Sequence, residues 1–598
     1  MMRRGLKWLL MASLSFVVCQ LLLCPMEAYA ARARGGWHDY RQPDGTTLSA
    51  ELRGDEWFHY YVTRDGVPLV SDTEVGALCY AQVLSSGLAS TGIVAHEADR
   101  RSAEEKPYMI SLGRLAGAEA AARASVQRRI TLVPHQDWDS AKVYKSPVLL
   151  IEFEDFEFGM ENPKAFYDSL FNQPGFNQGD GPGCVADYFR DQSGGLVNMQ
   201  FDVIGPFKTS YKAAKSGDSA PTIYRKVIMQ AADSLDFTQY DWFGTGDVQQ
   251  VVIVYAGYGG NDPGAEGQIW PSTGTVNAIN IDGARVTTYT GSPERWYRGS
   301  IEKYTSCGIG TICHEFSHCL GLPDLYPVGG DEPAFSIVDE WDLMDGGNYT
   351  NWGWCPCNYT PLEKMLLGWL KPEELTESAS IRSLKPVAQG GSAYQILNDN
   401  YPDEYYLLEN RQQQGWDACT PGHGLLVYHV DYSESVWNSN KVNSKKIRHR
   451  FELMHADNLD YDDWDNIVGT GKSPYLYSQK RCSRILSTSP YPYVTDDAEV
   501  RELTDTSTPA ATTNNRNKAG EYLMSKPLTG IFEHEDSTVS FDFMGGTLPP
   551  VGIQAPLSDR HLDDATYDLL GHRLPASSLQ KGLYIVRRKD GTTYKRIR

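Results

Sequence analysis

Residues 310–326 read GTICHEFSHCLGLPDLY, and this stretch decides both the fold and the chemistry expected of the chain. His314 and His318 stand four positions apart, so a helix places both imidazoles on one face, one turn apart. A tetrahedral zinc ion takes two ligands from a single helix in this way. Glu315 lies beside that face, where its carboxylate would reach a water molecule on the metal. The motif therefore predicts a zinc site on a helix.

The residues after the motif complete the predicted site. A helix is expected over residues 308–320, because Gly321 permits a sharp turn through a left-handed conformation and ends it. Asp324 then follows His318 by six residues and offers an oxygen as third ligand. Three protein ligands leave the fourth position for water, which is typical of a catalytic zinc. The metal lowers the pKa of that water towards about 7, and Glu315 serves as general base and acid in peptide hydrolysis.

The motif from His314 to Tyr326 resembles the active-site helix of the immune inhibitor A family of secreted bacterial zinc metallopeptidases, which are metzincin-like zincins. Residues 341–347, WDLMDGG, are similar to the methionine turn of that family, so the resemblance implies that Met344 is a hydrophobic base beneath the ligands. It covers most of residues 40–545. The same family pattern carries Asp324 over as third ligand; because most metzincins have histidine there, a glutamate elsewhere is the alternative.

Other residues have competing interpretations. Tyr349 could donate a hydrogen bond to the oxyanion, although it stands further from the methionine than the corresponding tyrosine of typical metzincins. Cys79 could ligate the zinc as a latency switch, or be an ordinary packed cysteine. A cluster of aspartates could cage calcium, but it lacks the loop pattern of an EF-hand, and a solvated acidic loop is the alternative. The cluster consists of Asp457, Asp460, Asp462, Asp463 and Asp465.

Length, charge and the first residues set the broad class. A chain of 598 residues is too long for one core. Its formal charge of -21 makes nucleic acid an unsuitable partner. Residues 1–30 have a basic start, an apolar run and Ala28-Tyr29-Ala30 as a small-x-small cleavage site, which predicts a signal peptide. The mature chain would begin near Ala31, without a transmembrane span, because the apolar run is too short for one.

The pattern of apolar runs and alternating residues along the sequence predicts a multidomain α+β protein. Residues 31–129 are read as a β-rich propeptide, residues 130–372 as a zincin-type α/β catalytic domain, and residues 373–545 as a β-sandwich. Residues 546–598 are read as a linker and a small β-domain that resembles the C-terminal sorting domain of type IX secretion. No internal repeat is evident.

Together these readings predict a zinc-dependent endopeptidase, made as a zymogen, that is secreted or attached to the cell surface. Its expected partners are extracellular protein substrates and, through residues 546–598, the secretion machinery. The alternative is a secreted adhesin or binding protein on a retained zincin scaffold. An intact Glu315 favours the enzyme, because a binding protein would have no need of the base.

Overall fold

The protein is described here by a computed structural model of the full chain. It divides into two compact units, Met1–Gly546 and Thr547–Arg598. The structure describes residues 28–34, 36–55, 58–84, 87–115, 118–119, 138–265, 268–296, 306–328, 336–445, 447–459, 486–496, 498–546, 565–567, 573–574, 583–587 and 593–597. Most of the predicted signal peptide therefore lies outside the described residues, as does the basic stretch at residues 127–129 that ends the predicted propeptide.

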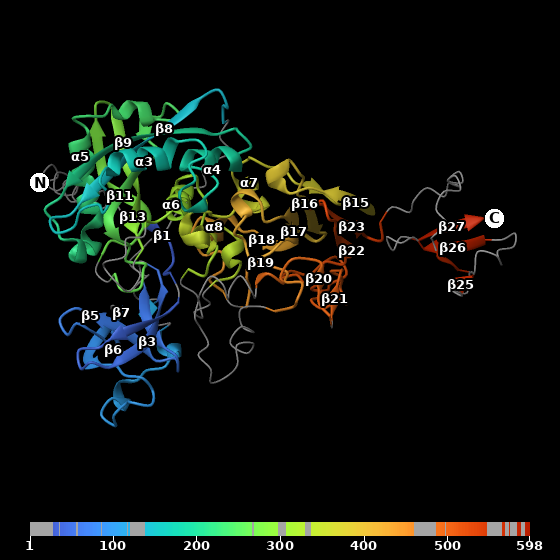
Figure 1. Cartoon of the computed structure of the whole chain (residues 1–598), viewed down its shortest axis with the longest axis horizontal. Helices are drawn as coiled ribbons and strands as arrows, with labels where there is room; N and C mark the ends of the chain where they lie inside the picture. The colour runs from blue at the N-terminus through green and yellow to red at the C-terminus, as the bar shows by residue number, and fades with distance from the viewer. Residues whose placement is uncertain are drawn as a thin grey trace, which may run out of the picture. The chain divides into compact units, whose positions relative to one another are not determined.

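A seven-stranded mixed sheet forms the centre of the region that carries the motif (Figure 1). Its strands run in the order β1-β12-β13-β11-β8-β9, and β10 pairs with β13 outside this path. Neighbours from β13 to β9 are parallel, whereas β12 is antiparallel to β13 and β1 is antiparallel to β12. The strands are β1 (Ala28–Ala30), β8 (Val143–Glu152), β9 (Asn198–Lys208), β10 (Asp247–Val248), β11 (Val251–Tyr258), β12 (Ser272–Ile281) and β13 (Ala284–Arg295).

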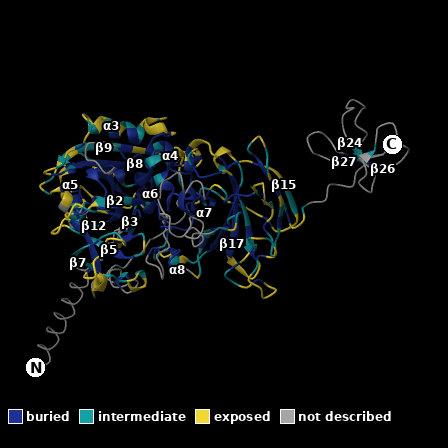
Figure 2. Cartoon of the chain, turned by 60° about the horizontal axis from the view of Figure 1, so that its bottom comes forward, coloured by how far each residue is buried: buried dark blue, intermediate teal, exposed yellow. Residues whose placement is uncertain are grey.

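Helices cover both faces of this sheet, which explains why β11 is buried at every position. Val148, Leu150 and Val254 point to a core shared with α3, α4 and α6, whereas Leu149 and Ile253 point to a core shared with α5. Helix α6 is buried along its length, as Figure 2 shows, so it lies inside the protein rather than on its surface. The helices are α3 (Pro163–Asn172), α4 (Val185–Gln192), α5 (Ala220–Ala231), α6 (Gly310–Cys319) and α7 (Pro361–Leu366).

The N-terminal region forms a separate six-stranded antiparallel sheet, with its strands paired in chain order from β2 to β7 (blue in Figure 1). One of its two apolar cores includes Ala33 and also Trp270, which comes from the loop before β12. The ring of His59 lies 4.8 Å from that of Trp270, so this sheet packs against the region of the motif. The strands are β2 (Trp37–Arg41), β3 (Thr47–Gly54), β4 (His59–Thr63), β5 (Pro68–Asp72), β6 (Ala77–Leu84) and β7 (Gly87–Val94).

Two further sheets follow α7, in the orders β14-β16-β17-β18-β19 and β15-β23-β22. Tyr406 and Leu408 of β17 face a core shared with the smaller sheet, but Tyr405 and Leu407 face the same core as α6. The larger sheet is therefore a middle layer. Its elements and those of the smaller sheet are β14 (Glu373–Glu374), β15 (Ala379–Leu384), β16 (Tyr394–Asn398), β17 (Tyr401–Arg411), β18 (Gly424–Asp431), α8 (Glu434–Trp437), β19 (Phe451–Leu453), β22 (Leu528–Glu533) and β23 (Val539–Phe543).

A two-stranded ribbon, β20 (Tyr493–Val494) and β21 (Glu499–Val500), completes the first unit. The second unit contains an antiparallel sheet in the order β25-β24-β26-β27. Its strands are β24 (Ala565–Tyr567), β25 (Arg573–Leu574), β26 (Leu583–Arg587) and β27 (Thr593–Ile597). Among the described helices, none combines the length and the apolar character needed to cross a membrane. The chain thus has the expected mixed α+β fold, built on several sheets with few helices, whereas its division into the predicted domains stays a prediction.

Candidate metal centre

Helix α6 carries His314 and His318 on one side, with their ring centroids 5.0 Å apart. The Nδ1 atom of His314 lies 2.8 Å from the carbonyl oxygen of Leu343, and that of His318 lies 2.8 Å from the carbonyl oxygen of Leu322. Because a carbonyl only accepts, each Nδ1 carries the proton and each Nε2 keeps its lone pair. Both rings thus present Nε2 to the same point, in the form that binds a metal.

Asp324 reaches that point from the chain beyond the helix. Gly321 has φ 98°, the left-handed conformation expected of it, and it turns the chain back towards the histidines. Asp324 Oδ1 lies 3.4 Å from His314 Nε2 and 3.3 Å from His318 Nε2. The three side chains are buried, and among the described residues they form the one group of histidine, cysteine or carboxylate ligands close enough to hold a metal ion.

The spacing of these atoms suits zinc. Zinc–nitrogen bonds of about 2.0–2.1 Å at tetrahedral angles require ligand atoms about 3.3–3.4 Å apart, which is the separation observed. Neither His314 Nε2 nor Asp324 Oδ1 makes a hydrogen bond, although both atoms are buried. Buried polar atoms without partners are rare in proteins, so a ligand is needed at this point. Burial also lowers the pKa of His314, which keeps the ring neutral for metal binding.

Glu315 lies on the same helix and is fully buried. Its Oε1 atom accepts a hydrogen bond of 2.6 Å from the backbone N–H of Ala31, a residue 284 positions earlier in the chain. The side chain of Thr273, on β12, donates to the Glu315 carbonyl oxygen. The carboxylate is therefore held beside the metal cluster within reach of a peptide N–H group.

Met344 is buried, and it follows Leu343, whose carbonyl oxygen contacts His314. Its neighbour Leu343 accepts the hydrogen bond from His314, and the carbonyl oxygen of Met344 accepts one of 2.9 Å from the N–H of Leu325. This turn thus fixes the orientation of one imidazole and the path of the chain that carries Asp324. The methionine lies among apolar neighbours of the main core, as a structural residue would.

Asn440 also belongs to the site, and sequence reasoning missed it. Its Oδ1 atom accepts from the N–H of Asp324 at 2.7 Å, while its Nδ2 donates to Asp324 Oδ2 at 2.6 Å. One oxygen of the aspartate is therefore engaged, and the other is left facing the histidines. Asn443 and Ser444 donate to the carbonyl oxygens of Leu325 and Val328, so residues 440–444 hold the whole segment that follows the helix.

The remaining sequence candidates lie elsewhere or stay untested. The hydroxyl of Tyr349 donates to the carbonyl oxygen of Arg32 at 2.7 Å, so it contacts the N-terminal segment here. Cys79 is a buried residue of β6 and is not a member of the described metal cluster. Asp457 accepts hydrogen bonds from the N–H of Leu459 and the hydroxyl of Thr488. The other predicted calcium ligands, Asp460, Asp462, Asp463 and Asp465, lie outside the described residues.

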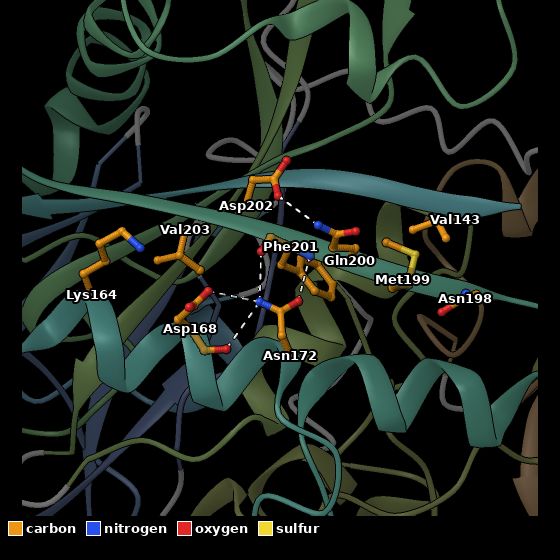
Figure 3. A pocket seen from close by; sticks show the side chains of 10 residues that line it. All are labelled: Val143, Lys164, Asp168, Asn172, Asn198, Met199, Gln200, Phe201, Asp202 and Val203. Carbon is orange, nitrogen blue, oxygen red and sulfur yellow. Dashed lines mark hydrogen bonds between the residues drawn. The ribbon is translucent and has the colours of Figure 1, made fainter.

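A separate groove of about 630 Å³ lies between α3 and β9 (Figure 3). Its polar side chains include Lys164, Asp168 and Asp202, and none of its lining residues belongs to the metal cluster. The Asn172 amide binds the N–H and the carbonyl oxygen of Phe201, each at 2.9 Å, so it caps the exposed edge of β9. The groove therefore lies along a capped edge of the sheet and is separate from the candidate metal site.

Comparison with known proteins agrees with this geometry. Residues 145–366 match the family model described as "Immune inhibitor A peptidase M6, catalytic domain", a stretch that contains the metal cluster and Glu315. Immune inhibitor A of Bacillus thuringiensis subsp. alesti is 27% identical over 268 residues, which cover 36% of this chain and 38% of that protein. The pre-pro-metalloprotease PrtV of Vibrio cholerae serotype O1 is 22% identical over 318 residues, or 45% of this chain and 32% of that protein.

These matches confirm the resemblance drawn from the motif and support a peptidase of the metal-dependent kind. The matched part amounts to 38% of the first relative and 32% of the second, so the activity of those proteins as wholes does not carry over. Asn440 and Ala31, which contact the site, both fall outside residues 145–366.

Proposed function

We propose that this protein is a zinc-dependent endopeptidase in which His314, His318 and Asp324 hold the metal and Glu315 transfers the proton. The observation that carries the proposal is the convergence of two imidazole nitrogens and one carboxylate oxygen at 3.3–3.4 Å, with the glutamate on the same helix. Three protein ligands leave one position open, as a catalytic site requires. A zinc ion bound there supplies Lewis acidity towards water and towards the carbonyl group of the peptide.

The protein's own residues account for the rest of the reaction. Glu315 takes the proton of the attacking water and delivers it to the nitrogen of the leaving amine. Its hydrogen bond to the N–H of Ala31 is evidence that a peptide nitrogen fits within reach of the carboxylate. In the full chain, β1 pairs with β12 before Ala31 and the N–H of Arg34 binds the carbonyl oxygen of Asn261 after it. The site therefore has room for chain on both sides of a peptide bond, which favours cleavage within a chain rather than at its end.

The proposal extends to the life cycle of the protein. A secreted zymogen is consistent with the contacts of Ala31 and Arg32 at the site, and we infer that the N-terminal region keeps the enzyme latent. The C-terminal unit would serve export or surface attachment, and extracellular proteins would be the substrates. A secreted adhesin on the same scaffold is the second candidate, and the state of Glu315 distinguishes the two, because binding does not need a buried general base.

The test uses the purified full chain before and after limited tryptic digestion, with its zinc content and its cleavage of casein measured in parallel. Glu315→Gln should retain zinc but lower cleavage by roughly 100- to 10,000-fold, the usual contribution of a general acid-base group. Glu502→Gln, at an exposed position, is the matched control and should behave as the wild type. A Glu315→Gln protein with wild-type cleavage would refute the mechanism, and zinc binding without any cleavage would favour the adhesin.

A further inference from the structure

Residues 28–34 lie beside the metal centre, and the first three of them form strand β1. Strand β1 pairs antiparallel with the edge strand β12, with Ala28, Tyr29 and Ala30 opposite Gly274, Thr273 and Ser272. The next residue, Ala31, donates its N–H to Glu315. Peptides that bind an exposed sheet edge add a strand in the same manner, with affinity from the main chain and selectivity from side-chain pockets. The segment therefore lies as a bound substrate would.

The register of the segment fixes the position of the bond to be cleaved. Glu315 is the group that would return a proton to the leaving nitrogen, and the nitrogen beside it belongs to Ala31. The bond at the reacting position is therefore the one that joins Ala30 to Ala31. Residues 31–34 then represent the substrate after the cut. Residues 28–30 belong to the predicted signal peptide, so in the mature chain Ala31 would be the first residue.

Hydrogen bonds to the main chain of the segment do not depend on which side chains it carries. Trp270 Nε1 donates to the carbonyl oxygen of Ala31 at 2.6 Å, and the Tyr349 hydroxyl donates to that of Arg32 at 2.7 Å. The N–H of Arg34 donates to the carbonyl oxygen of Asn261 at 2.8 Å. Any extended peptide could make these bonds, so selectivity has to come from the side chains.

The side chain of Arg32 enters an acidic pocket and is only 4% exposed. Its Nη2 lies 2.7 Å from Asp339 Oδ1 and its Nε lies 3.7 Å from Asp345 Oδ1, with both aspartates fully buried. Asp345 is itself fixed by three backbone N–H groups, of residues 337–339, at 3.0 Å each. A buried and preorganised negative pocket of this kind favours a positive side chain over an uncharged one, because buried carboxylates are stable only when they are paired and hydrogen-bonded.

A second acidic pocket receives Arg34. Its Nε donates to Asp262 Oδ1 at 2.8 Å, and Asp262 is buried. The guanidinium group lies 5.3 Å from the ring centres of both Trp296 and Trp352, within the range of cation–π attraction. A planar guanidinium suits two flanking aromatic rings and a carboxylate better than the compact ammonium group of lysine does.

We propose that the site selects peptides with arginine at the second and fourth residues after the cleaved bond, and that residues 31–34 occupy it as those residues of a substrate would. This inference rests on the proposed function and adds its substrate class. The preference arises from Asp339 and Asp345 for the second residue, and from Asp262, Trp296 and Trp352 for the fourth.

The test is a series of quenched fluorescent peptides based on the sequence Ala-Tyr-Ala-Ala-Arg-Ala-Arg, with the purified full chain after limited tryptic digestion and removal of the trypsin. Glu315→Gln protein treated in the same way gives the background to be subtracted, and mass spectrometry of the products identifies the bond that is cut. Either arginine is replaced in turn by lysine, glutamine or glutamate, and kcat/KM is measured for each peptide. Arginine at the second position after the cut should exceed glutamine by roughly 10- to 100-fold, the range expected for a lost charge-assisted hydrogen bond. Lysine should fall between them, and glutamate should be the poorest.

Two variants of the enzyme assign each preference to its pocket and serve as controls for each other. Asp339→Asn should reduce the ratio of the arginine to the glutamine peptide at the second position and leave the ratio at the fourth unchanged. Asp262→Asn should do the reverse. Asparagine tolerates the left-handed backbone of Asp339, whose φ is 46°, so the first substitution preserves the local conformation.

The outcomes separate this inference from the proposed function. Glu315-dependent cleavage with equal kcat/KM for arginine and glutamine peptides would overturn the inference alone. Absence of cleavage of any peptide and of casein would overturn both. If Asp339→Asn does not fold, inhibition of the wild-type enzyme by short peptides replaces this variant. The inhibition constant of acetylated Ala-Arg-Ala-Arg should be at least about 10-fold lower than that of acetylated Ala-Gln-Ala-Gln. Equal inhibition by the two peptides would contradict the selectivity.

Discussion

Two segments far apart in the sequence, residues 28–34 and residues 440–444, reach the same metal centre but contact different parts of it. The first contacts Glu315 and pairs with β12, at the position where we propose that a substrate binds. The second contacts Asp324 through two hydrogen bonds from Asn440, which engage its backbone N–H and one carboxylate oxygen. If the proposed function holds, the first contact opposes activity because it occupies the substrate position, whereas the second supports activity because it orients a metal ligand.

Of the substitutions in these two segments, that of Asn440 should change zinc affinity and activity the most. Asn440→Ala removes both hydrogen bonds to Asp324 and frees the aspartate to rotate away from the histidines. Loss of such a supporting partner costs roughly 10- to 100-fold in metal affinity or activity. We expect a fall of that size in zinc affinity, measured by competition with a chelator, and a parallel fall in cleavage that excess zinc partly restores.

The control for this prediction is Asn400→Ala, at an exposed turn of the same region, which should leave zinc affinity unchanged. An Asn440→Ala protein that binds zinc as tightly as the wild type would show that residues 440–444 do not position the ligand. Loss of activity with unchanged zinc affinity would assign them a role in substrate binding instead.

A smaller effect of opposite sign is expected at the other segment. Arg32→Gln combined with Arg34→Gln removes the charges that hold residues 28–34 in the two acidic pockets. The segment should leave the cleft more readily, and the initial rate of peptide cleavage by the undigested full chain should rise roughly 10-fold. Arg100→Gln, at an exposed position of the N-terminal region, should leave the rate as it is. A rate that stays flat in the double variant would mean that the segment does not block the cleft.

The sequence predicts the local part of this site and misses the long-range part. A spacing of four residues and a glycine after the helix are local features, and the structure has α6 and a left-handed Gly321 where they are expected. Ala31 and Asn440 lie 284 and 116 positions from the residues they contact, and no local pattern marks either of them.

The packing of the sheets was also beyond what local sequence patterns predict. The apolar run of β17 predicts a strand, but it does not tell that Leu407 faces the core of α6 while Leu408 faces the smaller sheet. A strand that lies between two apolar cores has the same run of apolar residues as a strand buried inside a single domain. One apolar core contains residues from both sides of residue 372, so the change in sequence pattern there does not mark the end of that core. The domain boundary itself stays a prediction.

Zinc K-edge X-ray absorption of the purified full chain tests the central claim most directly, because it reports the identity of the ligands rather than activity. The account predicts one zinc per chain, two imidazole nitrogens at about 2.0–2.1 Å with oxygen completing the shell, and loss of the bound zinc in Asp324→Ala. Folded protein that binds no zinc, or a sulfur ligand at about 2.3 Å, would contradict it.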